Sequence, residues 1–234
     1  MKCAIMQPTY LPWSGYFNLI NEVDYFVFLD DVQFNKRSWQ QRNRILQNGK
    51  ELMLSIPVLT KNKSTQKIID VEINNEIDWK KQHLKSIEFS YKKSEFYNQI
   101  MPFVEMIYRF QTNKLVDFTL HFILKTIELL AINTTIVYSH SINSKTKKSQ
   151  HLIDICTYLN CEHYLSPQGS KEYIEAENLF EKSNINVIYQ SFNPSAYKQT
   201  NTNDFISHLS ILDVLFHLGV EGTKEYIRNG IEVL

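Results

Sequence analysis

The chain has 234 residues, of which 43% are hydrophobic and 21% are charged. These proportions are typical of a globular protein and exclude a disordered or fibrous chain. The 25 lysines and arginines balance the 25 aspartates and glutamates, so the formal net charge is zero. Zero net charge argues against bulk electrostatic binding of nucleic acid or of an anionic membrane, and we expect neither as a partner.

The three cysteines, Cys3, Cys156 and Cys161, are an odd and widely spaced set, which is typical of a reduced compartment. Cys156 and Cys161 precede His163 at a spacing that is not a standard zinc motif, so we predict no metal site and leave the cofactor open. The most apolar stretch, residues 115–132, contains charged residues, which favours an amphipathic helix over a membrane span. We therefore expect a cytoplasmic protein.

The amino-terminal part of the chain has the pattern of an α/β protein. Residues 3–6 and 24–29 are short apolar runs that predict strands. Between them, the spacing of the apolar residues Tyr16, Phe17, Leu19 and Ile20 predicts a helix over residues 14–22. This order indicates a parallel strand pair with a crossover helix. Asn48-Gly49 lies between the strand-like runs 42–47 and 50–58, which predicts a β-hairpin.

The rest of the chain alternates between helical and extended patterns. We predict a strand over residues 68–73, and then two or three helices over 78–132, with breaks near Lys93 and Pro102. These helices form a cap or an insertion in a single α/β domain of residues 1–234, in which a mainly parallel sheet is flanked by helices. The remaining predicted strands are 135–139, 163–166 and 185–190, and the remaining predicted helices are 148–160, 170–178, 210–218 and 222–229.

The first candidate site is the loop Gln7–Gly15, which joins the first strand to the first helix. Ligands of open α/β sheets usually bind at such strand ends. Two prolines stiffen the loop, and the helix start near Ser14 offers free backbone amides to an anion. The alternative is a loop that is only packed by its aromatic side chains. The candidate ligand-binding residues here are Gln7, Tyr10, Trp13, Gly15 and Tyr16.

The second candidate site is the segment Asp30–Arg44, which follows the second strand. A carboxylate at a strand end can act as a general base, and neighbouring side chains point to opposite faces, so one of Asp30 and Asp31 is expected to enter the site. Arginines can clamp phosphate or carboxylate groups. The alternative is a solvated loop of mixed charge. The candidate binding residues are Gln33, Lys36, Arg37, Trp39, Arg42 and Asn43.

Two later clusters are weaker candidates. Gln168, Ser170 and Tyr173 follow a predicted strand and could bind phosphate, although the P-loop spacing is absent and helix capping is an equal alternative. For the cluster formed by Tyr197–Gln199 and Ser207–Asp213, the apolar spacing favours packing and capping.

Four strings carry a family resemblance: IMQPTYLPWSGYFNLI, DYFVFLDDVQFNKRSWQQRNRI, HYLSPQGSKEYI and FISHLSILDVLFHLG. They resemble the WbqC-like protein family, over most of the chain. The resemblance implies a cytoplasmic step on a nucleotide-linked sugar in O-antigen or other surface-polysaccharide synthesis. The glycine pattern around Leu165–Ser170 is thinner than the family's. The residues that fit the family pattern are Gln7, Pro8, Tyr10, Pro12, Trp13, Gly15, Tyr16, Asp30, Asp31, Gln33, Arg37, Trp39 and Arg42.

The leading hypothesis is a transferase that modifies a nucleotide-linked amino sugar by acyl or aminoacyl transfer. In this hypothesis Asp30 or Asp31 takes a proton from the attacking amine, Tyr10 is a further catalytic candidate, arginines hold an anionic group, and aromatic rings stack on a base or sugar. A second hypothesis is nucleotidyl transfer or ATP-dependent activation, although Trp13–Tyr16 lacks the histidine of HxGH loops. A third is a non-catalytic module that binds RNA or a partner through Lys36–Arg44. A homodimer is left open.

Overall fold

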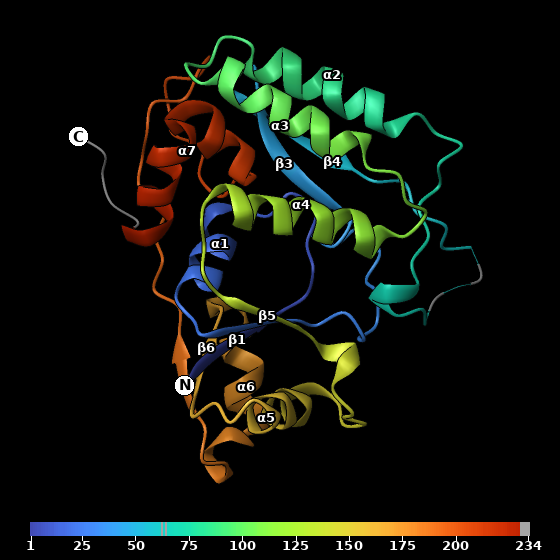
Figure 1. Cartoon of the computed structure of the whole chain (residues 1–234), viewed down its shortest axis with the longest axis vertical. Coiled ribbons are helices and arrows are strands. Elements are labelled where there is room, and N and C mark those ends of the chain that lie inside the picture. The colour runs from blue at the N-terminus through green and yellow to red at the C-terminus, as the bar shows by residue number, and fades with distance from the viewer. Residues whose placement is uncertain (62, 64, 230–234) are drawn as a thin grey trace. The chain divides into compact units, whose positions relative to one another are not determined.

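The computed structural model describes residues 1–61, 63 and 65–229 of the chain (Figure 1). The chain divides into two compact units whose segments alternate along the sequence. Unit 1 comprises residues 1–7, 18–31 and 132–192, and unit 2 comprises residues 8–17, 32–131 and 193–234. The boundary between residues 17 and 18 falls inside helix α1 (Ser14–Asn21).

Unit 1 is built on a five-stranded sheet with the order β5-β2-β1-β6-β7. Every pairing in this sheet is parallel, which confirms the predicted α/β class. Helices α5 and α6 lie beside β1 and β6 in Figure 1. The strands are β1 (Lys2–Met6), β2 (Tyr25–Phe28), β5 (Thr135–Tyr138), β6 (His163–Ser166) and β7 (Asn186–Tyr189), and the helices are α5 (Lys148–Tyr158) and α6 (Lys171–Glu177).

The register of the sheet brings several strand ends to one edge. Met6 pairs with Phe28, and Phe28 pairs with Tyr138, so β1, β2 and β5 end at the same level. From β1 the chain moves outward through β2 to β5, and then returns to the other side of β1 with β6 and β7. The direction of winding therefore reverses between β1 and β6, which is the point where open α/β sheets usually bind ligands.

One face of the sheet is buried against α5 and α6. Cys3 and Ile5 of β1 share an apolar cluster with Leu152, Ile155 and Ile174 from these helices. Both faces of a parallel sheet are normally covered, and β2 fits this rule because Phe26, Val27 and Phe28 are all fully buried. The continuous apolar runs that predicted the strands are therefore a result of burial on two faces.

In its described residues, unit 2 contains an antiparallel hairpin, the first half of α1, the short turn η1 and four longer helices. The hairpin is formed by β3 (Arg42–Gln47) and β4 (Lys50–Ser55), and it confirms the prediction made from Asn48-Gly49. Both turn residues have positive φ angles, 50° and 72°, as a type I′ turn requires. The helices are α2 (Trp79–Tyr91), α3 (Tyr97–Arg109), α4 (Leu115–Leu129) and α7 (Ile211–Asn229).

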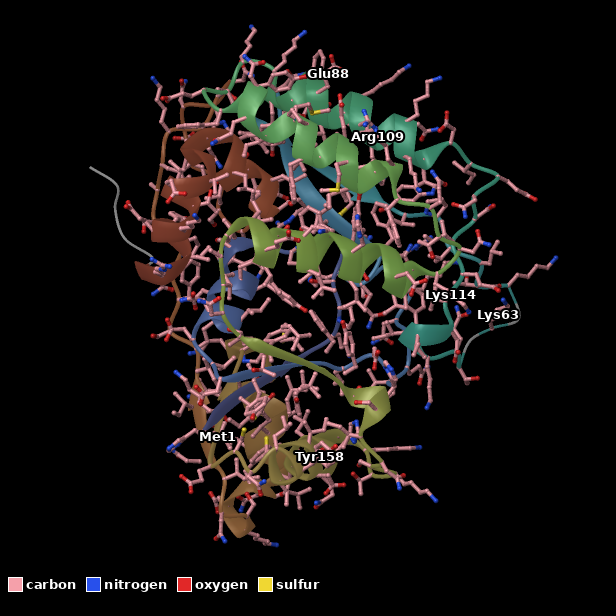
Figure 2. The ribbon with its side chains drawn as sticks, in the orientation of Figure 1. Met1, Lys63, Glu88, Arg109, Lys114 and Tyr158 are labelled. Atoms are coloured by element: carbon pink, nitrogen blue, oxygen red, sulfur yellow. The ribbon has the colours of Figure 1, made fainter. Side chains whose placement is uncertain are left out.

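Exposed charged side chains lie on the helices of unit 2, together with exposed apolar ones such as Phe89 and Met106. Glu88 on α2 and Arg109 on α3 project outward in Figure 2, and the side chain of Arg109 is 80% exposed. None of the helices in the described part of the chain is long and apolar enough to cross a membrane.

Two predictions about unit 2 are wrong. Residues 68–73 do not form a strand: Ile68–Asp70 is the 3₁₀ turn η1, and Ile73 makes only an isolated bridge to Val58. The apolar run is too short for periodicity to separate a strand from a buried turn. Pro102 lies inside α3 and does not break it. The missing amide of Pro102 would bond to the carbonyl of Asn98, and both residues are exposed, so water can satisfy that carbonyl.

The predicted break between residues 218 and 222 is confirmed. Gly219 has a φ of 67° and separates two helical parts of α7. Helices α2, α3 and α4 also confirm the helical character of residues 78–132. That these helices act as a cap stays a prediction.

Candidate functional site

The carboxyl ends of β2 and β5 in unit 1 hold a cluster of polar side chains around Asp30. The Asp30 carboxylate is 1% exposed. Its Oδ1 accepts hydrogen bonds from the Ser139 hydroxyl and the His140 backbone N–H, each at 3.1 Å. The backbone N–H of Asp30 in turn donates to Ser139 Oγ at 3.1 Å. These contacts hold a carboxylate at the strand ends, where the sequence predicted a site.

His140 completes this cluster. Its Nδ1 lies 2.5 Å from Asp30 Oδ2, and its side chain is 46% exposed. A buried carboxylate that accepts a hydrogen bond from Nδ1 fixes the tautomer and the orientation of the imidazole, so that Nε2 is the nitrogen that can take up a proton. Asp30 and His140 therefore form a dyad with one buried, positioning group and one accessible group.

Asp31 lies beside the dyad and pairs with a second histidine. Its Oδ1 is the nearer acceptor of the single Ser139 hydroxyl proton, which it shares with Asp30 Oδ1, and lies 3.4 Å from Nε2 of the buried His151. The Nδ1 of His151 is 2.9 Å from Ser144 Oγ. Burial alone would raise the pKa of Asp31, but the contacts with His151 and Ser139 outweigh it and lower the pKa to about 2. A carboxylate with so low a pKa is a weak general base.

The low pKa of Asp31 predicts how stability depends on pH. Because the folded-state pKa, about 2, is below the ordinary value of 3.8, the stabilisation is present above pH 4 and is lost as the pH falls towards 2. We expect Asp31→Asn to lower the free energy of unfolding at pH 7 by about 1 kcal/mol after allowance for solvent screening. Urea denaturation at pH 7, 4 and 2.5 should show this difference shrinking. Asp78→Asn, at an exposed residue, should change stability little at every pH.

The edge between β1 and β6 carries four of the predicted residues. Gln7 follows β1, and Gln168 and Ser170 form the 3₁₀ turn η3 (Gln168–Ser170) after β6. Tyr173 follows in the first turn of α6 and is 41% exposed. The side-chain amide of Gln168 donates to the Gln190 carbonyl at 2.9 Å. Gln168 thus has a structural contact, and a ligand-binding role for all four residues stays a prediction.

In unit 2, the loop Pro8–Trp13 is tied to the second half of the Asp30–Arg44 segment. The Tyr10 N–H donates to the Trp39 carbonyl at 2.9 Å. The Asn43 side-chain amide donates to the carbonyls of Tyr10 and Leu11 at 3.1 and 2.8 Å. Asn43 is 5% exposed, so its side-chain amide stabilises the loop through these two hydrogen bonds. The structure therefore brings these two predicted segments together.

Part of that segment is exposed, whereas Arg42 and Arg44 are partly buried. Gln33, Lys36 and Arg37 are exposed, and Trp39 is 48% exposed. The Arg44 guanidinium lies 5.2 Å from the centre of the Trp39 ring. Arg37 has a φ of 62°, which is uncommon for a residue other than glycine. Such backbone strain clusters at binding and active sites.

Two predicted tyrosines belong to the core of unit 2. Tyr10 is fully buried, and its hydroxyl bonds to Tyr108 Oη and lies 2.8 Å from His83 Nδ1. Tyr16 is 2% exposed. Burial raises the pKa of both tyrosines and lowers that of His83 to about 4. These values favour neutral groups in a packed interior, and direct contact of Tyr10 or Tyr16 with a ligand stays a prediction.

Gly15 is required by the position of Trp13. An added Cβ at Gly15 would lie 2.2 Å from the Trp13 ring, whose centre is 4.6 Å from that of His208. We expect Gly15→Ala to displace the indole and to destabilise the protein by about 1–3 kcal/mol. Chemical denaturation and the tryptophan emission spectrum measure both effects. Gly169→Ala is the control, because nothing lies within 4 Å of its added Cβ. Equal stability of the two variants would contradict the prediction.

Comparison with known proteins places the chain in a family. The sequence profile of the WbqC-like protein family matches residues 7–225. The chain belongs to the WbqC-like family. It is also similar to a Mycobacterium tuberculosis (strain H37Rv) protein described as uncharacterized protein Rv1507c, with 31% identity over 229 residues that cover 97% of each chain. No solved structure matches the chain significantly.

In this WbqC-like protein, the residues that the sequence did not single out are Ser139, His140 and His151. His140 is 110 positions from Asp30 in sequence, so neither residue indicates the other. The available signal was the position of Ser139 and His140 at the carboxyl end of the predicted strand 135–139, because carboxyl ends of parallel strands share an edge. Within the described residues, no group of three or more His, Cys, Asp and Glu side chains is arranged to hold a metal ion.

Proposed function

We propose that this WbqC-like protein is a transferase of bacterial surface-polysaccharide synthesis that moves an acyl or aminoacyl group onto the amine of a nucleotide-linked amino sugar. The observation that carries the proposal is the pairing of Asp30, 1% exposed, with His140, 46% exposed, at 2.5 Å. A buried carboxylate behind an accessible imidazole is the arrangement used for general base catalysis. The resemblance to a family linked with surface polysaccharides supports the choice of substrate.

In the proposed reaction, the sugar amine attacks the carbonyl carbon of an activated thioester or ester. The C–N bond forms, the amine proton moves to His140 Nε2, and the bond from the carbonyl carbon to the leaving sulfur or oxygen breaks. His140 then returns the proton to the leaving group. Asp30 stabilises the imidazolium that exists between these two steps. Asp31, with a pKa of about 2, contributes negative charge and is a weak proton acceptor.

Four side chains are the proposed binding groups: Arg37 and Trp39 are exposed, and Trp13 and Arg42 are partly buried. Arg37 and Arg42 would hold the phosphates, because a guanidinium can form two parallel hydrogen bonds with them. Trp13 and Trp39 would stack on the base or the sugar ring. The exposure of Arg37 and Trp39 supports these assignments. Lys36 provides further positive charge in the same segment.

The test is direct incubation of the purified protein with UDP- or dTDP-linked amino sugars and a panel of acyl thioesters and aminoacyl esters. Mass spectrometry should detect a nucleotide sugar that is heavier by the acyl group. Absence of both turnover and binding across the panel would contradict the proposal. Parallel reactions with ATP and Mg²⁺ test the rival activation reaction, which predicts release of pyrophosphate.

A further inference from the structure

Unit 2 has an open hollow that is lined by two lysines and five uncharged polar residues. Its volume is about 480 Å³, and it is lined by Lys93, which follows α2, and by the segment 198–203. None of the lining residues is an aspartate or glutamate. The ion pairs found in the described part of the chain involve other lysines and arginines. Lys93 and Lys198 therefore face the hollow without a carboxylate to balance them there.

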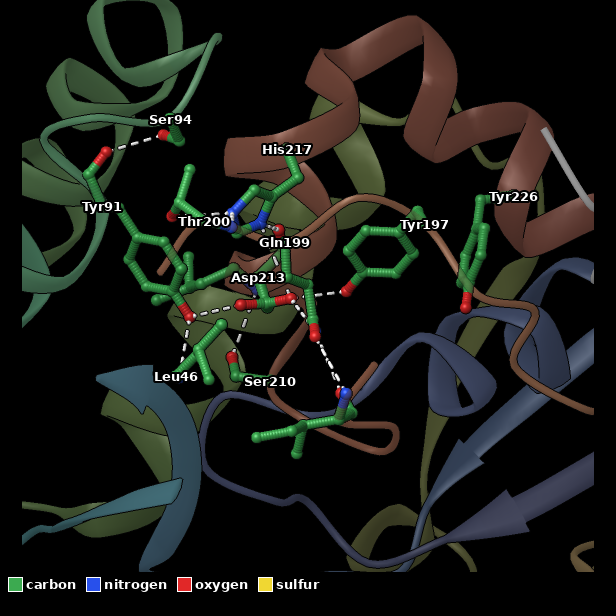
Figure 3. A network of polar contacts seen from close by, with 12 residues as sticks. Leu46, Tyr91, Ser94, Tyr197, Gln199, Thr200, Ser210, Asp213, His217 and Tyr226 are labelled. Carbon is green, nitrogen blue, oxygen red and sulfur yellow. Dashed lines mark hydrogen bonds and ion pairs between the residues drawn. The ribbon is translucent and has the colours of Figure 1, made fainter. Parts of the chain in front are cut away.

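Two lining residues, Gln199 and Thr200, belong to the polar network drawn in Figure 3. The Thr200 N–H donates to His217 Nε2 at 3.0 Å, and the Thr200 hydroxyl is 3.1 Å from the same atom. Gln199 donates to Asp213 Oδ2 at 2.8 Å and accepts the Ile206 N–H at 2.8 Å. Because these contacts fix both ends of its polar side chain, Gln199 anchors the segment, and the hollow has a preformed shape.

The Asp213 carboxylate lies behind the lining residue Gln199 and is covered by hydrogen-bond donors. Asp213 is fully buried, and its carboxylate accepts hydrogen bonds from Tyr91, Tyr197 and Gln199. Lys93 follows the carboxyl-terminal end of α2, where a cation is favourable for the helix dipole. This explanation does not extend to Lys198, because Lys198 lies outside every helix and strand. Both lysines line the hollow, where an anionic ligand could reach them.

We infer that this hollow binds a phosphoryl group, either as free inorganic phosphate or as the phosphate of a nucleotide. Two ammonium groups can pair with phosphate oxygens, and the side-chain amides of Asn201 and Asn203 add neutral donors. The volume is in the range of small-molecule sites and exceeds what phosphate alone needs, so an esterified phosphate also fits. The inference is independent of the proposed transferase reaction, whose proton acceptor lies in unit 1.

Isothermal titration calorimetry of the full chain at constant ionic strength tests the inference, with inorganic phosphate in one arm and UDP in the other. We expect saturable binding in at least one arm. Lys198→Ala and Lys93→Ala should each weaken it at least about fivefold, the size of a typical charge-assisted contact. Lys85→Ala is the matched control, because Lys85 is an exposed lysine of α2 outside the hollow. Binding of inorganic phosphate would show that the free ion is a sufficient ligand. Binding of UDP alone would show that the hollow requires the phosphate of a nucleotide.

The inference would be overturned if neither phosphate nor UDP bound, or if Lys85→Ala and Lys198→Ala lowered the affinity equally. It would also be overturned if only UDP bound and Lys198→Ala left that binding intact. Thermal melts verify that each variant is folded. His140→Ala should leave phosphate binding unchanged, so failure of the proposed reaction and failure of the hollow are separate results.

Discussion

Replacing His140 with alanine is expected to lower kcat for acyl transfer about 10²- to 10⁴-fold, the usual contribution of a general base. The melting temperature should fall only modestly, because the His140 side chain is 46% exposed and Asp30 Oδ1 keeps its hydrogen bonds from Ser139 and the His140 backbone N–H. Steady-state kinetics with the amino sugar and the acyl donor measure the first quantity, and differential scanning calorimetry measures the second. His163→Ala is the matched control, since His163 is an exposed histidine at the start of β6, and we expect full activity from it.

The companion substitution Asp30→Asn separates positioning from direct catalysis. Asparagine keeps the shape of the side chain but removes the charge that stabilises the imidazolium. We expect kcat to fall with little change in KM, and the rising limb of the kcat/KM profile to move to lower pH. His140→Ala activity close to that of the unchanged protein would exclude this histidine as the base. Loss of activity in Asp30→Asn with an unmoved pH profile would reduce Asp30 to a structural role.

The sequence predicted most elements of the fold because the relevant signals are local. The apolar runs of β1 and β2 and the Asn48-Gly49 turn each specify structure within a few residues. The prediction for residues 68–73 was wrong where a short run, with Ile68 and Ile73 both buried, fits a turn as well as a strand. The sequence pattern predicted a helix break at Pro102. The helix α3 tolerates this proline because the carbonyl that loses its hydrogen-bond partner belongs to an exposed residue.

The sequence predicted the site residues that directly follow a strand, and it did not predict which side chains pair with them. Asp30 and Asp31 were recognised as strand-end carboxylates, but their partners His140 and His151 come from segments more than 100 residues away. Which strand ends lie next to each other depends on the order of the strands in the sheet. The order β5-β2-β1 is a property of the tertiary structure and cannot be read from local sequence patterns. The same reasoning applies to Asp213, where packing and capping were expected and a buried polar network is present.

Asp213→Ala is expected to destabilise the protein by about 3–5 kcal/mol, because it leaves buried donors without an acceptor. The Tyr91 and Tyr197 hydroxyls lie 3.0 and 2.6 Å from the carboxylate, and the Gln199 amide lies 2.8 Å from it. In a chain of this length the melting temperature should fall by about 10 °C. Tyr197→Phe removes one donor and keeps the acceptor, so it should cost only about 1 kcal/mol.

The pH dependence of the stability lost in Asp213→Ala shows whether the neighbouring His217 is charged in the folded protein. The Nδ1 of His217 lies 3.6 Å from Asp213 Oδ2. Burial alone would lower the pKa of His217, but the hydrogen bonds and charge of Asp213 raise it above its ordinary value of 6.5. A raised folded-state pKa gives stabilisation that is complete below pH 6.5 and is lost as the pH rises through the folded value. Urea denaturation should therefore show a larger cost of Asp213→Ala at pH 6 than at pH 9. An equal cost at both values would mean that Asp213 acts only as an acceptor for the tyrosines and the glutamine, and that His217 is neutral in the folded protein.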